Sequence, residues 1–138
     1  MNQAETLRDI LRTARTIAVV GLSPSAHRAS HQVAAYLQRA GYRIVPVRPG
    51  AGTILGEPVH ATLEEAHRAA GPLDIVNLFR RSETIPDLLQ SLLAVRPRLV
   101  WMQLGVHHEP TAARLREAGM TVVMDRCLMV DHPLIVGG

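Results

Sequence analysis

The sequence predicts an α/β protein with a doubly wound parallel sheet, and two features of the chain lead to that prediction. Short apolar runs alternate with amphipathic segments along the whole chain, as in successive right-handed βαβ units. Each apolar run is almost free of polar residues, which is typical of strands covered by helices on both faces. We therefore expect one domain over 1–138, a Rossmann-like sheet of five to six strands with helices on both faces.

The first half of the chain is expected to supply the central strands. Apolar residues at helical spacing alternate there with β-branched runs, and Gly41 marks the end of a helix. The expected elements are a helix over 3–14, a strand over 16–21, a helix over 30–40, a strand over 43–48 and a short edge strand around 57–60.

The second half continues the alternation. Thr62 and Glu65 form a capping-box pattern that begins a short helix, and Gly71 and Pro72 end it. The later expected elements are a strand over 74–79, a helix from 82 or 84 to 94, a strand over 98–102, a helix over 109–118 and a strand over 120–124. The tail is expected to contain one short helical stretch and then to fray.

The charge of the chain is unusual, because its net value of +3 comes from fifteen arginines and no lysine. The missing lysines exclude Schiff-base and Walker A chemistry. The arginines are spread along the chain and aromatic residues make up only 3 % of it, so we expect no nucleic-acid partner. No apolar run approaches the roughly 20 residues of a membrane helix and no signal peptide is evident, which predicts a cytoplasmic protein without membrane contact.

Candidate ligand-binding residues follow the predicted strands, at the edge where doubly wound sheets bind ligands. The first strand runs into Gly21 and Ser23, a turn suited to presenting backbone N–H groups to a phosphate. Arg48 ends the second strand, where NAD-binding domains carry an acidic residue, so the expected ligand carries an additional phosphate. The candidate cofactor-binding residues are Gly21, Ser23, Arg28, Ser30, Val47, Arg48, Pro49, Phe79, Arg80, Gln103 and Gly105.

Five blocks of sequence, in order, carry a family resemblance. They are Val20-Gly21-Leu22-Ser23-Pro24 with Arg28 and Ser30, the strand Val45-Pro46-Val47-Arg48-Pro49, Phe79-Arg80-Arg81, Trp101-Met102-Gln103-Leu104-Gly105, and Met124-Asp125-Arg126-Cys127. Together they resemble the small stand-alone CoA-binding proteins, which are similar to the N-terminal domain of the succinyl-CoA synthetase α subunit. The resemblance spans about residues 5–135 and implies a Rossmann-type domain that binds coenzyme A.

The chemistry of coenzyme A suits these positions. The turn at Gly21 and Ser23 and the following helix N-terminus are expected to receive the pyrophosphate, with Arg28 and Ser30 closing over it. Arg48 is expected to bind the 3′-phosphate. A valine at Gly21 is expected to abolish binding with only a moderate loss of stability, by filling the space of the pyrophosphate.

The remaining candidates concern the two ends of the ligand. Val47 and Pro49 are expected to bracket the adenine. Phe79, Arg80 and the segment Gln103–Gly105 are expected to lie along the pantetheine. Whether free CoA, an acyl-CoA or another adenine nucleotide is the working ligand stays open at this point, as does any protein partner.

Three functions are compatible with these residues. In the synthetase, catalysis uses a phosphorylated histidine from a second domain and a grasp-type subunit, so we expect this chain to bind CoA without catalytic activity of its own. An NADP-dependent oxidoreductase is the alternative, because Arg48 could equally bind a 2′-phosphate, although Gly21-Leu22-Ser23 is not a G-x-G-x-x-G turn. A vestigial Rossmann interaction module is the third, and it predicts no nucleotide affinity.

Structural interpretations compete for several residues. Trp101 is expected in the core, Arg80 and Arg81 could form a solvated pair, and Arg126 could pair with Asp125.

Two further groups of side chains contain residue types that occur in metal sites or in disulfides. His107-His108-Glu109 is expected to be a solvated loop and not a metal site. Cys127 is expected to be a structural cysteine. The synthetase resemblance, through an Asn-Cys-Pro-Gly stretch after the corresponding strand, suggests the alternative that Cys127 forms a mixed disulfide with CoA on oxidation.

Overall fold

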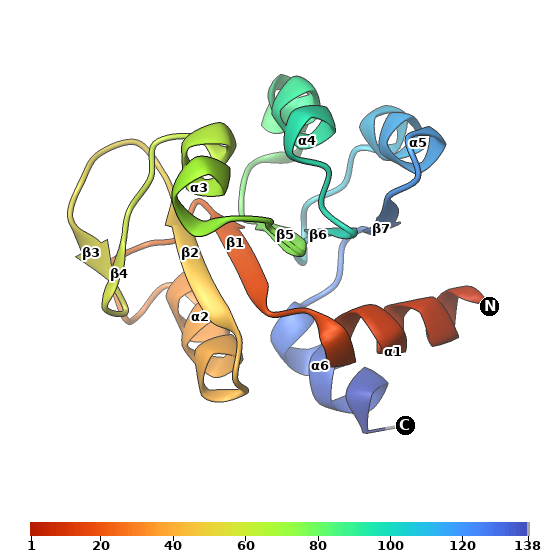
Figure 1. The fold of residues 1–138 in the computed structure, drawn as a ribbon, viewed down its shortest axis with the longest axis horizontal. Helices are drawn as coiled ribbons and strands as arrows, with labels where there is room; N and C mark the ends of the chain where they lie inside the picture. The colour runs from red at the N-terminus through yellow and green to blue at the C-terminus, as the bar shows by residue number, and fades with distance from the viewer. Residues whose placement is uncertain (138) are drawn as a thin grey trace.

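The computed structural model describes residues 1–137, and its main sheet has five parallel strands in the order β2-β1-β5-β6-β7 (Figure 1). These strands are β1 (Thr16–Val20), β2 (Arg43–Val47), β5 (Ile75–Leu78), β6 (Leu99–Met102) and β7 (Thr121–Val123). Strand β1 pairs with β2 on one side and with β5 on the other. The chain order reverses direction across the sheet at the β1–β5 boundary, where doubly wound folds bind ligands. The predicted fold class is confirmed.

The expected edge strand around 57–60 is only partly present. His60 forms a single parallel bridge with Val47, at the place of a third strand beside β2. Residues before it form a separate antiparallel hairpin of β3 (Thr53–Ile54) and β4 (Glu57–Pro58). Pro58 has no N–H to donate to a ladder, which accounts for the short strand.

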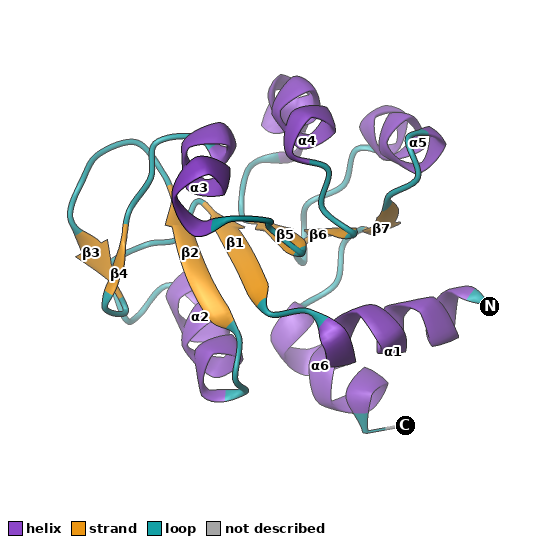
Figure 2. Cartoon of the chain, in the orientation of Figure 1, coloured by secondary structure: helices purple, strands orange, loops and turns teal. Residues whose placement is uncertain are grey.

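Three helices cover each face of the sheet (Figures 1 and 2). One face packs against α3 (Leu63–Ala70), α4 (Leu89–Val95) and α5 (Glu109–Glu117). The other packs against α1 (Gln3–Thr13), α2 (Ala29–Arg39) and α6 (Leu128–Val136). Trp101 is fully buried beneath the second group, as predicted. Within residues 1–137, no helix is both long and apolar enough to cross a membrane.

The helix expected from 82 or 84 begins differently from the prediction. Residues Ser82–Leu88 form a 3₁₀ segment that contains Pro86, and the α-helical hydrogen bonding begins only at Leu89. Proline lacks a backbone N–H and disfavours the α conformation in the residue before it, which explains the tighter first part.

The tail contains the helical stretch that the sequence predicts, as the helix α6, which packs against α1 and α2. The expected fraying concerns the end of the chain, whose last residue lies outside the described residues. A buried cluster at His132 secures α6. The Tyr36 hydroxyl lies 2.8 Å from His132 Nδ1 and the Tyr42 hydroxyl 3.0 Å from Nε2. Tyr42 also donates to the Leu11 carbonyl of α1. Residues 90 or more positions apart make these contacts, so the pattern of the tail alone could not reveal them.

Burial favours the neutral form of His132, and the hydrogen bonds of its cluster determine the tautomer. Because the Tyr42 hydroxyl donates its proton to Leu11, it accepts from Nε2–H of His132, and Nδ1 then accepts from Tyr36. Burial of the ring lowers the pKa of His132, and burial likewise raises the pKa of Tyr42.

Candidate functional site

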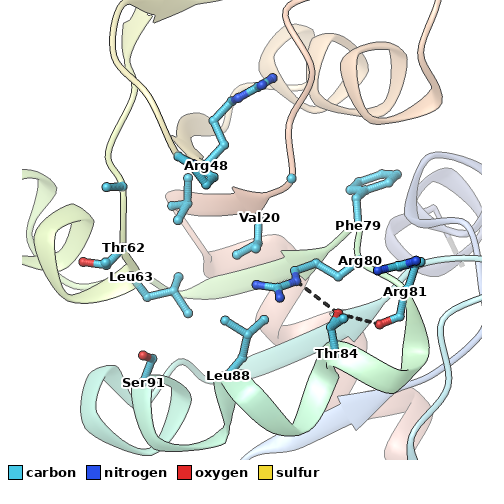
Figure 3. A pocket seen from close by; sticks show the side chains of 14 residues that line it. Val20, Arg48, Thr62, Leu63, Phe79, Arg80, Arg81, Thr84, Leu88 and Ser91 are labelled. Atoms are coloured by element: carbon cyan, nitrogen blue, oxygen red, sulfur yellow. Dashed lines mark hydrogen bonds between the residues drawn. The ribbon is translucent and has the colours of Figure 1, made fainter.

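A cavity of about 550 Å³ opens where β1, β2 and β5 end, on the face covered by α3 and α4 (Figure 3). It brings together six of the residues predicted from sequence: Gly21, Val47, Arg48, Pro49, Phe79 and Arg80. Residues from the neighbouring helices complete it, and they are Thr62, Leu63, Thr84, Leu88 and Ser91 together with Val20, Ala61 and Arg81. The walls are largely apolar, with arginines and hydroxyl groups at intervals. This first cavity therefore combines a surface for a flat ring with donors for anions.

Arg80 points into the first cavity, where its guanidinium lies between Leu63 and Leu88 (Figure 3). Its Nε donates to the Thr84 hydroxyl at 3.2 Å, and that hydroxyl donates to the Arg81 carbonyl at 2.7 Å. The two terminal nitrogens of Arg80 have no acceptor among residues 1–137. Nε thus holds the Arg80 side chain in place. The two terminal nitrogens, which form the fork of the guanidinium, remain available for bidentate binding of a phosphate.

Arg48 takes a different direction. Its side chain leaves the end of β2 and points away from the centre of the first cavity (Figure 3), and one terminal nitrogen donates to the Leu22 carbonyl at 3.3 Å. Arg48 therefore lies along the rim beside the loop that joins β1 to α2. The two arginines therefore occupy different parts of the first cavity: Arg80 lies in the interior and Arg48 lies at the rim.

The start of the loop between β1 and α2 is hydrogen-bonded to β2 and to α2. Gly21 N–H donates to the Val47 carbonyl at 2.9 Å, and Ser23 N–H donates to the Ser30 hydroxyl at 3.0 Å. The expectation that these two amides face a phosphate is therefore wrong. The available donors belong to the first turn of α2, which carries neither a side-chain cap nor an acidic residue.

Gly21 has a structural reason to be glycine. Its φ is +83°, and a Cβ built there would lie 2.2 Å from the carbonyl oxygen of Phe79. A side chain at this position would meet the end of β5 and not the space of a ligand. The prediction that a valine here would cause only a moderate loss of stability is wrong for that reason.

A second cavity, of about 220 Å³, lies on the opposite face of the sheet, between α2 and the start of α6. Phe79 lines both cavities. The other residues of the second cavity are Ala29, Gln32, Val33, Gln103, Leu104, Cys127 and Met129. Gln103 is 5 % exposed and is held by buried neighbours. Because Ala29 is the first residue of α2, the uncapped helix N-terminus lies beside this cavity, and the loop that precedes it leads back to Gly21 in the first cavity.

Comparison with known proteins identifies the chain. Residues 15–133 match the family described as the CoA binding domain. The chain belongs to this family. Its relative in Bacillus subtilis (strain 168), the uncharacterized protein YneT, is 41 % identical over 126 residues, which are 91 % of either protein.

Solved structures extend the comparison. A Thermus thermophilus protein, cell-free ID.343, shares 41 % identity and a TM-score of 0.90, with 98 % of this chain and 99 % of the other covered. The ATP citrate lyase of Methanothrix soehngenii, solved with citrate and coenzyme A, is 16 % identical with a TM-score of 0.54. The match covers 80 % of this chain and 20 % of the lyase chain, and at 16 % identity it shows a shared fold.

Four residues predicted for the site of this CoA-binding domain line neither cavity: Ser23, Arg28, Ser30 and Gly105. Ser23 and Ser30 are hydrogen-bonded to each other beside the first cavity. Arg28 is exposed at the start of α2. Gly105 donates its N–H to Asp125 Oδ1 at 2.7 Å, and its carbonyl accepts from the Ser82 hydroxyl at 3.3 Å. These bonds make Gly105 part of a turn that joins two loops at this edge.

Specific contacts bear on two other expectations. Arg126 pairs with Asp131 of α6, through NH2 at 3.2 Å from Oδ1, and not with Asp125. His107 and His108 lie in a loop, as expected, and His107 is exposed. His108 is half-buried and caps α5, its Nδ1 accepting from the Thr111 amide at 3.3 Å. Glu109 of the same segment pairs with Arg116 at 3.1 Å.

Two chemical expectations have a structural context but no test. No group of three or more potential metal ligands occurs in the described part of the chain. Cys127 lines the second cavity and is partly buried, so its mixed disulfide with CoA stays a prediction.

Sequence reasoning missed the helical side of the first cavity, formed by Thr62, Leu63, Leu88 and Ser91. The capping box at Thr62 was a usable signal. Thr62 accepts from the Glu65 amide at 3.1 Å and so begins α3. A helix that begins after β2 and before β5 must run from the carboxyl edge back to the amino edge, so its first residues belong beside the ligand site.

Proposed function

We propose that this protein binds coenzyme A across the carboxyl edge of its sheet and has no catalytic activity of its own. The 3′-phosphoadenosine part occupies the first cavity, the diphosphate lies across the N-terminus of α2, and the pantetheine leads into the second cavity. One observation carries the proposal: two cavities on opposite faces share Phe79 and flank an uncapped helix N-terminus. A long ligand with anions near its middle fits that arrangement.

The charges support this placement. Arg80 offers an open guanidinium fork inside the first cavity, and Arg48 lies at its rim beside the β1–α2 loop. Coenzyme A carries its 3′-phosphate on the ribose and its diphosphate on the 5′ side, so two separated cations suit it better than a single cluster. Arg48 is assigned to the 3′-phosphate, and Val47 and Pro49 flank the adenine. Arg80 is assigned to the nucleotide half and not to the pantetheine, because it lies in the first cavity.

An oxidoreductase finds less support. A dehydrogenase of this fold would need an acid–base group near the cofactor, and the chain has two tyrosines and no lysine. Both tyrosines, Tyr36 and Tyr42, contact His132 beneath α2 and line neither cavity. A vestigial fold would bind no nucleotide at all, so a ligand titration separates it from the proposal.

The decisive experiment is calorimetric titration with CoA, 3′-dephospho-CoA, NADP, NAD and ATP. Wild-type protein should prefer CoA over 3′-dephospho-CoA by about tenfold or more, because a charge-assisted hydrogen bond contributes roughly 1.5–3 kcal/mol. Arg48→Ala should lose this preference. Arg43→Ala is the matched control, since Arg43 begins the same strand at the opposite edge and donates to the Ala70 carbonyl at 3.5 Å. Equal binding of both ligands by wild type would contradict the role of Arg48, and absence of CoA binding would contradict the function.

Catalysis is tested separately. Purified protein incubated with acyl-CoA or NADPH should consume neither above the buffer rate. Steady turnover that disappears in Arg80→Met would overturn the proposal of a binding protein.

A further inference from the structure

Gln103 in the second cavity has an amide whose orientation is determined by its neighbours. It follows the last residue of β6 and is 5 % exposed. Its Oε1 accepts from the Leu128 backbone N–H at 3.4 Å and from Asn77 Nδ2 at 3.2 Å. A backbone N–H can only donate, so the oxygen of the Gln103 amide must face Leu128 and the nitrogen must face elsewhere.

The nitrogen of Gln103 is left with two N–H donors that have no acceptor among residues 1–137. Gln103 lines the second cavity, where such donors can meet a ligand. The side-chain atom of this group that is fully buried without a partner is Asn77 Oδ1 and not the Gln103 nitrogen, which is accessible from the second cavity and can be satisfied there. The geometry therefore suits a ligand that brings an acceptor, such as a carbonyl oxygen, to this point.

The rest of the second cavity defines the group attached to that acceptor. No charged side chain lines the cavity, and most of its walls are apolar. Its other amide, that of Gln32, donates to the His27 carbonyl at 3.5 Å. The volume of about 220 Å³ equals that of about seven water molecules. A short, uncharged chain beside a carbonyl matches both the lining and the size.

We propose that the second cavity binds the acyl end of a short-chain acyl-CoA and that Gln103 donates to the thioester carbonyl. This inference rests on the proposed function, because it requires the pantetheine to reach the second cavity past Phe79. It selects acyl groups of about two to four carbons. A terminal carboxylate is disfavoured because no cation lines the cavity, and a long chain exceeds its volume.

The test compares ligands that differ only in the carbonyl. Butyryl-CoA and its thioether analogue S-butyl-CoA are titrated into wild-type protein, with CoA, succinyl-CoA and palmitoyl-CoA alongside. Butyryl-CoA should bind about three- to tenfold more tightly than S-butyl-CoA, the effect of one hydrogen bond in a shielded site. Succinyl-CoA and palmitoyl-CoA should bind no more tightly than CoA.

Two variants locate the effect. Gln103→Met should reduce the preference for butyryl-CoA over S-butyl-CoA to less than twofold. Because Met also removes the acceptor of the Leu128 amide, Cys127→Leu provides a second route: it narrows the cavity from another wall and should weaken butyryl-CoA relative to CoA. Gln32→Ala is the matched control for loss of an amide in the same cavity and should keep the preference.

The outcomes separate the two proposals. If wild type does not bind CoA, the proposed function fails. If CoA binds but butyryl-CoA and S-butyl-CoA bind equally, or if folded Gln103→Met keeps the preference, the acyl inference alone is overturned. If Gln103→Met does not fold, retention of full butyryl-CoA affinity in Cys127→Leu overturns it instead.

Discussion

The two edges of the sheet use arginine in opposite ways. At the amino edge, guanidinium groups are paired with the protein itself: Arg96 donates to the Ala118 carbonyl at 2.7 Å, at the end of α5, and Arg98 pairs with Asp9 at 3.5 Å. At the carboxyl edge, Arg80 uses only Nε internally and leaves its fork in the first cavity. Arginine content alone therefore says little about ligand binding. What distinguishes the two edges is whether the chain itself supplies the acceptors.

The physical basis is the direction of the helices. Helices that follow parallel strands end at the amino edge, where their last carbonyls carry partial negative charge and accept from arginine. They begin at the carboxyl edge, where unpaired N–H groups add to the positive potential of Arg48 and Arg80. The same architecture thus neutralises cations at one edge and accumulates them at the other.

The largest effect is a loss of stability expected from Gly21→Val. This variant tests whether close packing, and not only ligand binding, constrains the residues at the carboxyl edge. The new Cβ would meet the Phe79 carbonyl at 2.2 Å at a φ of +83°. We expect a loss of about 3 kcal/mol or more in the free energy of unfolding, measured by urea denaturation. Gly71→Val is the matched control, because Gly71 also has a φ of +83° but no atom within 4 Å of its Cβ position. Equal losses in the two variants would show that backbone strain alone matters at Gly21.

Arg80→Met should have the next largest effect, and it tests the contrast between the edges directly. CoA affinity should fall by about tenfold or more, because a charge-assisted contact inside the first cavity is lost. Arg96→Met, at the amino edge, should change CoA affinity by less than twofold. Titration of both variants under one set of ionic conditions makes the comparison. A similar loss in both would mean that general charge, and not the unpaired fork of Arg80, attracts the ligand.

Thr84→Val should act on the same arginine more weakly. The hydroxyl of Thr84 accepts from Arg80 Nε at 3.2 Å and so orients the guanidinium. Without it, the fork loses part of its preorganisation, and CoA affinity should fall by about threefold. The double variant Thr84→Val/Arg80→Met should bind CoA no more weakly than Arg80→Met alone. An additive loss would indicate that Thr84 contacts the ligand independently.

A smaller effect is expected on stability at the amino edge. Arg96→Met removes a hydrogen bond to the carbonyl of Ala118, at the negative end of α5. The free energy of unfolding should fall by about 0.5–1 kcal/mol, measured by urea denaturation. Arg81→Met is the control at the other edge, where the exposed pair with Glu83 should contribute little. If Arg81→Met lost more free energy of unfolding than Arg96→Met, the arginine at the carboxyl edge would be the structural one, and the contrast between the two edges would be wrong.

The smallest effect is expected from acid acting on the His132 cluster. The folded-state pKa of His132 lies below the value of 6.5 usual for histidine, because the ring is buried. As the pH falls below about 6.5, the unfolded chain takes up a proton that the folded chain does not, so the free energy of unfolding decreases. His132→Gln should show a shallower decrease between pH 7 and 5, whereas exposed His107→Gln should follow wild type. An unchanged slope in His132→Gln would remove the cluster as the cause.

The sequence by itself determined the layers of the fold and the edge of the sheet at which the first cavity lies. Burial of each residue follows a local period, so near-continuous apolar runs and helical spacing were enough to predict the strands from Thr16 to Val123. Val47, Arg48 and Phe79 were assigned to the site because each lies at the carboxyl end of a strand of a parallel sheet. These inferences need only neighbours along the chain.

Tertiary structure alone decided which groups are available there. The amides of Gly21 and Ser23 are paired with Val47 and Ser30, and the Gln103 amide is oriented by Leu128, 25 residues away. The helix α6 is secured by tyrosines 90 and 96 positions before His132 in the chain. Hydrogen bonds are directional and short-ranged in space, so their pairing depends on which distant residues the fold brings together. Periodicity records that a residue is buried, and it carries no information about the atom that faces it.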